Sequence, residues 1–211
     1  MQWLAHNGYA VLQINYRGSS GYGTDFAEAG LRELGRGIED DIDAAVMTAL
    51  AAYSQLDRNR IGLFGASYGG YSALMSVIRN PDLYRCGASF AGVTDLTLLF
   101  AKSRVHKNPE LREKVARIVG DPDLDYEEQT RNSPVYRYRE IDRPIFLAHG
   151  TKDGVVDIEH SWRLRMLMRR RGVDPDFVVI DDAGHGFDYV EDAELLYVPL
   201  LAFLDKHLMV N

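Results

Sequence analysis

A serine between glycines is the residue of this sequence whose setting points most directly to chemistry. Residues 65–71 read GASYGGY, so Ser67 fits the pattern G-x-S-x-G. In that pattern a tight turn between a strand and a helix lifts the serine hydroxyl above a sheet, and glycines avoid clashes with the neighbouring backbone. An apolar run at residues 61–64 precedes the turn, and residues 71–78 follow it with apolar side chains at helical spacing. The sequence therefore predicts Ser67 as the nucleophile of a serine hydrolase.

An acid and a histidine follow Ser67 in the order that this kind of turn requires. A serine hydroxyl is a weak nucleophile until a base takes its proton, and in α/β hydrolases the partners follow as acid and then histidine. Asp153 comes directly after the apolar run at residues 145–148, and His185 follows the run at residues 177–180. Because the carboxyl ends of parallel strands meet at one edge of a sheet, we expect Asp153 to orient His185, and His185 to act as the base.

Other residues compete for these roles. His149 also ends a strand, but it is only four positions from Asp153, so it is poorly placed to bridge acid and serine and is expected to shape the loop. The acid could instead be Asp157, Asp181 or Asp182, although Asp157 fits better as the cap of a helix that starts at the next residue. The remaining histidines have polar or helical surroundings and are expected at the surface or at helix caps: His6, His106, His160 and His207.

Four motifs give the chain a resemblance to a known family. They are GYAVLQINYRGSSGYG at residues 8–23, GASYGGY at 65–71, HGTKD at 149–153 and GHGF at 184–187. With these motifs the chain resembles the catalytic domain of the prolyl oligopeptidase family, especially its acylaminoacyl-peptidase and dipeptidyl-peptidase branches. The resemblance implies Ser67, Asp153 and His185 as the triad and the backbone N–H of Tyr68 as an oxyanion donor. It also implies hydrolysis of short peptides through an acyl-enzyme, with short acyl esters as alternative substrates, and no cofactor or metal.

Two features of such relatives have no counterpart in the sequence. Relatives carry an N-terminal β-propeller, and they carry a strand with a His-Gly-Gly-Pro or tyrosine-bearing loop that supplies a second oxyanion donor. That strand would lie between residues 9–14 and residues 60–64. We therefore expect one catalytic domain, residues 1–211, that is the C-terminal portion of a longer reading frame, or else a fragment of low activity that serves as an interaction module. An exposed sheet edge would favour homo-oligomers.

Composition excludes several other classes of protein. The chain of 211 residues has 46% hydrophobic and 26% charged residues, as a folded globular domain does, and its formal net charge of -7 argues against a nucleic-acid or anionic membrane surface. No apolar run approaches the roughly 20 residues that span a bilayer. The single cysteine, Cys86, cannot form an internal disulfide, reads as a small buried hydrophobe, and favours a reducing, cytoplasmic setting.

The elements that must position the triad alternate between strand and helix. Apolar runs predict buried parallel strands at residues 9–14, 61–64, 86–90, 145–148 and 177–180. Helical spacing recurs at residues 38–53 and 158–169. This alternation predicts the α/β-hydrolase class, a doubly wound, mostly parallel sheet with helices on both faces and its N-terminal strands missing. Residues 95–139 break the rhythm as an insertion, and Pro199 predicts a kink or two short helices within residues 192–208.

Overall fold

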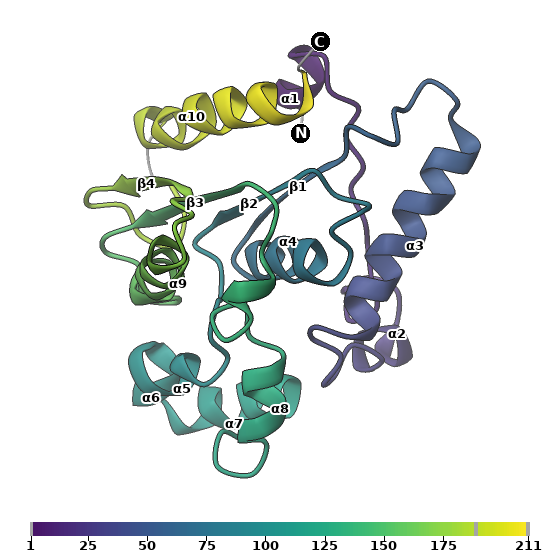
Figure 1. Ribbon diagram of the computed structural model, residues 1–211. Helices are drawn as coiled ribbons and strands as arrows, with labels where there is room; N and C mark the ends of the chain where they lie inside the picture. Colours follow the sequence, from purple (N-terminus) through teal and green to yellow (C-terminus); the bar gives the residue numbers. More distant parts are fainter. Residues whose placement is uncertain (1, 188–189, 210–211) are drawn as a thin grey trace.

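Four parallel strands form the centre of the computed structural model, which describes residues 2–187 and 190–209 (Figure 1). The strands are β1 (Gly62–Ala66), β2 (Cys86–Phe90), β3 (Ile145–Gly150) and β4 (Asp176–Ile180). They lie in the order β1-β2-β3-β4. In the register of the sheet, Ala88 lies opposite Phe64 on one side and Phe146 on the other. All four strands therefore end at the same edge, where the predicted catalytic residues follow them.

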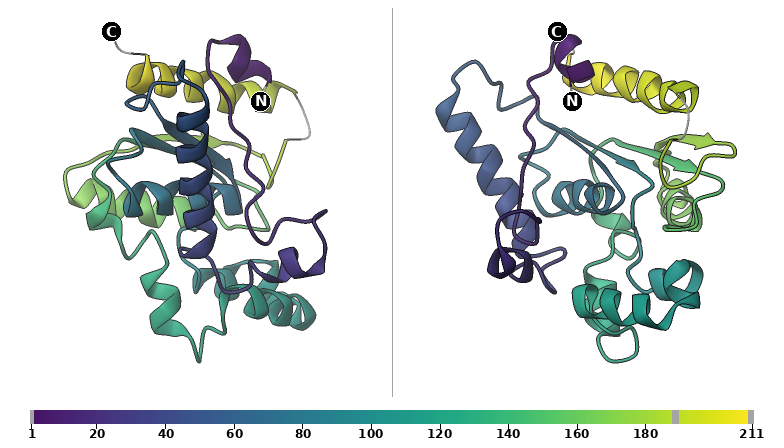
Figure 2. Two further views of the ribbon diagram at one scale, coloured as in Figure 1. Left: turned by 90° about the vertical axis from the view of Figure 1, so that its right-hand side faces the viewer. Right: turned by 180° about the vertical axis from the view of Figure 1, so that it is seen from behind.

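Helices cover both faces of this sheet, as the sequence predicts. Figures 1 and 2 show α10 on one face and α4 and α9 on the other. The helices are α1 (Gln2–His6), α2 (Thr24–Glu28), α3 (Gly37–Ala52), α4 (Tyr68–Arg79), α5 (Leu98–Lys102), α6 (Arg104–Lys107), α7 (Pro109–Val119), α8 (Tyr126–Arg131), α9 (Glu159–Arg170) and α10 (Val190–Leu208), with a 3-10 turn at Tyr138–Glu140. No helix among the described residues is long and apolar enough to cross a membrane.

Two apolar cores lie on the two faces of the sheet. Successive side chains of a strand point to opposite faces, so Phe146 and Leu147 of β3 belong to different cores. Leu147 packs in the core that includes Leu74 of α4. Phe146 packs in the core of α10, which includes Leu200 and Phe203. The two cores hold the strands so that their carboxyl ends, and the loops that follow, are fixed relative to one another.

The predicted strand at residues 9–14 is not part of the sheet. The segment has no strand assignment, and Val11 and Leu12 are 37% and 51% exposed. Among residues 2–187 and 190–209, no strand pairs with the edge of β1 that faces away from β2. Residues 9–14 have the apolar composition of a strand, but without a neighbour to supply backbone hydrogen bonds they form none of the sheet's ladder.

Helix α10 runs through Pro199 as a single helix. The predicted division into two short helices is therefore wrong. Proline removes the hydrogen bond to the carbonyl of the residue four positions earlier, here Leu195, which lies on the exposed side of the helix where water can bind that carbonyl. Burial of Leu196 and Leu200 against the sheet holds the helix together on its other side.

Residues 95–139 form the small helices α5 to α8, which extend from the α4 and α9 side of the sheet (Figure 1). Buried apolar residues such as Leu99 and Val105 join this segment to the larger core. The backbone N–H of Arg104 donates to the carbonyl of Gly154, at 3.2 Å. The insertion is therefore fastened to the loop that carries Asp153.

Candidate active site

Ser67 lies between β1, which ends at Ala66, and α4, which begins at Tyr68. Its backbone has φ 55° and ψ −119°, in the positive-φ region that non-glycine residues rarely adopt. The surrounding contacts hold it there: the Ser67 N–H donates to the Phe90 carbonyl at 2.9 Å, and the Ser67 carbonyl accepts from the Tyr71 N–H. The strained turn places the hydroxyl at the first turn of α4, whose free N–H groups and dipole favour negative charge.

Glycines make this turn possible at two close approaches. A Cβ on Gly65 would lie 2.2 Å from the backbone carbonyl carbon of Gly69. A Cβ on Gly70 would lie 2.5 Å from the hydroxyl oxygen of Ser89 and 2.9 Å from the Cα of Gly92. No side chain fits at either position without moving backbone, so the sequence pattern has a direct steric cause.

The structure brings together the three side chains that the sequence singles out. His185 Nε2 lies 2.8 Å from Ser67 Oγ, and His185 Nδ1 lies 2.7 Å from Asp153 Oδ2. Ser67 and His185 are separated by 118 residues in sequence. Because the carboxylate only accepts hydrogen bonds, Nδ1 carries the proton, and Nε2 is free to accept the proton of the serine hydroxyl. This arrangement can deprotonate a serine.

Asp153 is held as a carboxylate by the loop in which it lies. Its Oδ1 accepts from the backbone N–H groups of Val155 and Val156 at 2.8 and 2.9 Å. Burial by itself raises the pKa of Asp153, but hydrogen bonds from His149, His185 and these two N–H groups outweigh it and bring the pKa well below its ordinary value. The acid therefore keeps its negative charge next to His185 throughout the neutral range.

The alternative acids lie elsewhere. Asp157 Oδ1 accepts from the N–H of Glu159, the first residue of α9, although the N-cap of this helix is Ile158 and not Asp157. Asp182 is exposed, pairs with Lys152 at 2.8 Å, and has a positive φ of 62°. Neither is among the residues that hydrogen-bond to His185.

His160 differs from the prediction of a surface or capping residue, which is wrong. Its side chain is completely buried, and its Nδ1 accepts from the backbone N–H groups of Thr94 and Asp95 at 3.1 and 3.3 Å. Burial lowers the pKa of His160 to about 3, so the ring is neutral. The polar neighbours in sequence gave no sign of this burial, because the covering residues come from the segment after β2.

A buried glutamate contacts the residue next to Ser67, and sequence reasoning did not single it out. Glu39 of α3 is fully buried, and its Oε1 accepts from the Ser72 hydroxyl at 2.6 Å and the Tyr68 hydroxyl at 3.2 Å. Burial raises the pKa of Glu39, although those hydrogen bonds oppose the change. The available signal was helical spacing, since Glu39 lies on the same face of α3 as the apolar residues Ile42 and Val46.

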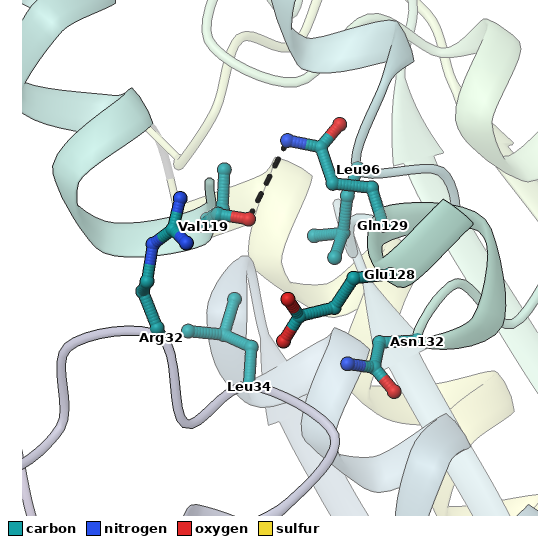
Figure 3. A pocket seen from close by; sticks show the side chains of 7 residues that line it. All are labelled: Arg32, Leu34, Leu96, Val119, Glu128, Gln129 and Asn132. Carbon is teal, nitrogen blue, oxygen red and sulfur yellow. Dashed lines mark hydrogen bonds between the residues drawn. The ribbon is translucent and has the colours of Figure 1, made fainter. Parts of the chain in front are cut away.

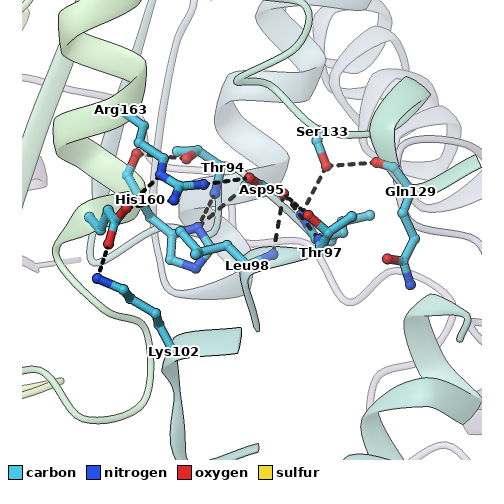
Figure 4. A network of polar contacts seen from close by, with 11 residues as sticks. Thr94, Asp95, Thr97, Leu98, Lys102, Gln129, Ser133, His160 and Arg163 are labelled. Carbon is cyan, nitrogen blue, oxygen red and sulfur yellow. Dashed lines mark hydrogen bonds and ion pairs between the residues drawn. The ribbon is translucent and has the colours of Figure 1, made fainter. Parts of the chain in front are cut away.

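A ladder of ion pairs joins the insertion, residues 95–139, to α9, which follows the loop that carries Asp153 (Figure 4). Asp95 Oδ2 lies 3.4 Å from Arg163, which pairs with Glu159 at 2.6 Å, and Glu159 also pairs with Lys102. Asp95 is almost fully buried, and its Oδ1 accepts from the N–H of Leu98 at the start of α5. The ladder fixes the first turns of α9, the helix that directly follows the loop of Asp153.

Two hollows lie away from the triad. One cavity of about 10 Å³ lies between the insertion and the loop before α3, lined by residues that include Arg32, Gln129 and Asn132 (Figure 3). It has room for one water molecule. A larger hollow of about 330 Å³ lies where β3 and β4 begin, at Ile145 and Asp176, the opposite edge of the sheet from Ser67. No group of three or more His, Cys, Asp or Glu side chains within the described part of the chain is arranged to hold a metal ion.

Several known proteins are similar to this chain in sequence and in fold. The model of the prolyl oligopeptidase family matches residues 1–211. Dipeptidyl aminopeptidase BIII of Pseudoxanthomonas mexicana is 33% identical over 188 residues, which cover 88% of this chain and 27% of that relative. Dipeptidyl peptidase family member 6 of Caenorhabditis elegans is 30% identical over 192 residues, which cover 87% of this chain and 25% of that relative. The chain thus spans about a quarter of the length of these relatives.

Solved structures agree with the sequence comparison. The acylaminoacyl peptidase of Pyrococcus horikoshii superposes with a TM-score of 0.89 at 26% identity, over 99% of this chain and 33% of that chain. A puromycin hydrolase mutant superposes with a TM-score of 0.83 at 27% identity, over 93% of this chain and 29% of that chain. The α/β-hydrolase fold class predicted from the sequence is therefore confirmed. With a family model that matches its whole length, the chain belongs to the prolyl oligopeptidase family of serine peptidases.

Proposed function

We propose that this chain is the catalytic domain of a serine peptidase that hydrolyses short peptides. The observation that supports it most is the position of His185 between Ser67 and Asp153, at 2.8 and 2.7 Å. Family membership and the dipeptidyl and acylaminoacyl peptidases among the similar proteins favour peptide bonds over esters as the substrate. The single, buried Cys86, whose pKa burial raises to about 12, fits a reducing compartment such as the cytoplasm.

The proposed reaction is an acyl transfer in two steps. His185 Nε2 takes the proton of Ser67 while Oγ attacks the carbonyl carbon of the substrate, and the oxyanion that forms accepts a hydrogen bond from the Tyr68 N–H. His185 then returns the proton to the leaving amine, and the C–N bond breaks to leave an acyl-enzyme on Ser67. Water, deprotonated by the same nitrogen, attacks the acyl group. His185 then donates that proton to Ser67 Oγ as the ester bond breaks, which releases the acid and free Ser67. Asp153 holds Nδ1–H and stabilises the imidazolium in both steps.

The test is covalent labelling of the chain by a fluorophosphonate, which reacts only with an activated serine. Ser67→Ala should abolish labelling and lower kcat by up to about a million-fold on an aminoacyl anilide, because the nucleophile is lost. Ser76→Ala is the matched control, since Ser76 is buried on α4 and its hydroxyl has no partner within the described part of the chain. Equal labelling of Ser67→Ala and wild type would refute the nucleophile, and turnover of short acyl esters with no turnover of anilides would favour an esterase.

A further inference from the structure

A second histidine lies against the carboxylate of Asp153. His149 is the penultimate residue of β3, and its side chain is completely buried. Its Nε2 lies 2.8 Å from the carbonyl oxygen of Val156 and 3.3 Å from Asp153 Oδ2. The same Oδ2 is the atom that contacts His185 at 2.7 Å. Asp153 Oδ2 therefore lies between two imidazole rings.

The partners of His149 determine which of its nitrogens carries the proton. A backbone carbonyl only accepts hydrogen bonds, so the contact with Val156 requires a proton on Nε2. The Nδ1 atom lies 2.8 Å from the hydroxyl of Ser161 on α9, and in the neutral ring this nitrogen is an acceptor. Ser161 therefore donates to Nδ1 and selects the tautomer whose Nε2–H faces the acid loop.

The helix that carries Ser161 is itself held in place. Ser161 directly follows His160, which accepts two backbone N–H groups of the segment after β2. The ladder from Lys102 through Glu159 and Arg163 to Asp95 fastens the same turn of α9 (Figure 4). A fixed helix thus positions the hydroxyl of Ser161, and the hydroxyl positions His149.

The two rings compete for one carboxylate. Asp153 Oδ1 is already occupied by the N–H groups of Val155 and Val156, so Oδ2 is the atom that both imidazoles share. A hydrogen-bond donor at Oδ2 draws on the negative charge of the carboxylate. It therefore weakens the attraction between the carboxylate and the imidazolium of His185. His149 thus restrains the carboxylate in the orientation that His185 needs, and it also limits how strongly Asp153 stabilises the protonated base.

We propose that His149 is a positioning residue for this reaction, which acts through Asp153 and is oriented by Ser161. The inference rests on the proposed function of Ser67, Asp153 and His185. Asp153 faces His149 directly, and His185 lies on the other side of the same carboxylate oxygen. His160 of α9 interacts electrostatically with His149, and also with Asp153, Glu159 and Arg163. The carboxylate of Asp153 is ionised and the ring of His160 is neutral at neutral pH.

The test compares His149→Leu with His149→Gln on an aminoacyl anilide. Leucine removes the donor, whereas the glutamine amide retains an N–H that can reach the Val156 carbonyl and Asp153. In His149→Leu, kcat should fall about 10- to 100-fold with KM unchanged, a loss of the size known for residues that orient metal-ligating side chains. The acid limb of the pH profile of kcat/KM should move to higher pH. His149→Gln should recover most of kcat and restore the acid limb.

Ser161→Ala keeps the proposal falsifiable if His149→Leu fails to fold. It removes only the hydroxyl that donates to Nδ1, and it should move the acid limb in the same direction by a smaller amount. Ser76→Ala is again the control, because it deletes a buried hydroxyl that makes no hydrogen bond within the described residues. A rate loss in His149→Leu without a shift of the acid limb would show a merely structural role and overturn the proposal, as would a Ser161→Ala profile that superposes on that of Ser76→Ala.

Failure of the inference and failure of the proposed function give different results. If Ser67→Ala labels with a fluorophosphonate as wild type does, the proposed function itself fails. If Ser67→Ala is inert while His149→Leu keeps the kcat and pH profile of wild type, only the role of His149 fails.

Discussion

At the scale of single residues, candidate catalytic residues that come directly after a strand could be predicted from the sequence. Contacts between buried residues that are distant in sequence could not. Ser67, Asp153 and His185 each follow an apolar run, and the structure places them in hydrogen-bond contact. Their catalytic roles stay a proposal. Glu39 and His160 were not predicted as buried, because what buries them comes from elements far away in the sequence, and polar residue types give no signal of such burial.

The buried ring of His160 gives the free energy of unfolding a dependence on pH. In the unfolded chain a histidine has a pKa near 6.5, whereas in the folded chain that of His160 is lowered to about 3, so between these values the unfolded state binds one more proton. The stability therefore falls as the pH drops below about 6.5. Between pH 7 and pH 5 the loss from this residue should be about 2 kcal/mol.

His160→Asn should remove this loss. Asparagine does not titrate, and its Oδ1 can replace Nδ1 as the acceptor for the Thr94 N–H, so urea unfolding of the variant at pH 7 and pH 5 should show a decline smaller by about 2 kcal/mol than that of wild type. His6→Asn is the control, because His6 is exposed. An equal decline in wild type and His160→Asn would contradict the prediction.

At the scale of elements, the positions of strands and amphipathic helices could be predicted, and elements that depend on a neighbour could not. Burial was predicted correctly for β2 and β3 but not for β1 and β4, which lie at the two edges of the sheet and are only partly buried. Strand β2 has the predicted bounds, and β1, β3 and β4 lie within two residues of theirs. Residues 9–14 have the composition of a strand but form no strand pairing with any described residue. A strand needs a neighbouring strand that supplies its backbone hydrogen bonds. Pro199 predicted a kink or two short helices, yet α10 is one helix because packing of one face against the sheet outweighs one lost hydrogen bond.

The turn between β1 and α4 should tolerate a methyl group at one glycine and reject it at another. Gly65→Ala should lower the free energy of unfolding by about 1–3 kcal/mol and abolish labelling of Ser67, because its Cβ would overlap the backbone of Gly69. Gly69→Ala is the matched control for stability, since a Cβ there meets nothing within 4 Å and alanine favours the helix. Chemical denaturation of both variants measures the difference. Equal stabilities would show that the close approach of Gly65 and Gly69 does not constrain the turn.

At the scale of the whole molecule, the alternation of strand and helix is sufficient to predict the fold class, and the similarity to the Pyrococcus horikoshii acylaminoacyl peptidase confirms it. The sequence also led to the expectation of an exposed sheet edge. In the described part of the chain, the outer edge of β1 has no strand partner, and the segment with Val11 and Leu12 is exposed. Edge strands with free N–H and C=O groups are sites of self-association.

Self-association of this chain should depend on that region. Wild type should associate as its concentration rises in sedimentation velocity. Leu12→Lys should weaken association about tenfold, or roughly 1.4 kcal/mol, because it puts a charge in place of an exposed apolar side chain in a segment that lies outside the sheet. Leu124→Lys is the control, since Leu124 is 86% exposed in the insertion, away from the sheet. A wild-type chain that stays monomeric, or equal effects of the two lysines, would contradict the prediction.

The connection between α9 and β4 lies where β4 begins, at the opposite ends of the strands from the triad. Gly172 has a φ of 88°, and both Gly172 and Val173 are exposed in a turn just before β4 begins. The hydrogen bonds of Ser67, Asp153 and His185 all form at the other ends of the strands. An affinity tag inserted between Gly172 and Val173 would therefore attach the protein to a surface with Ser67 facing the solution.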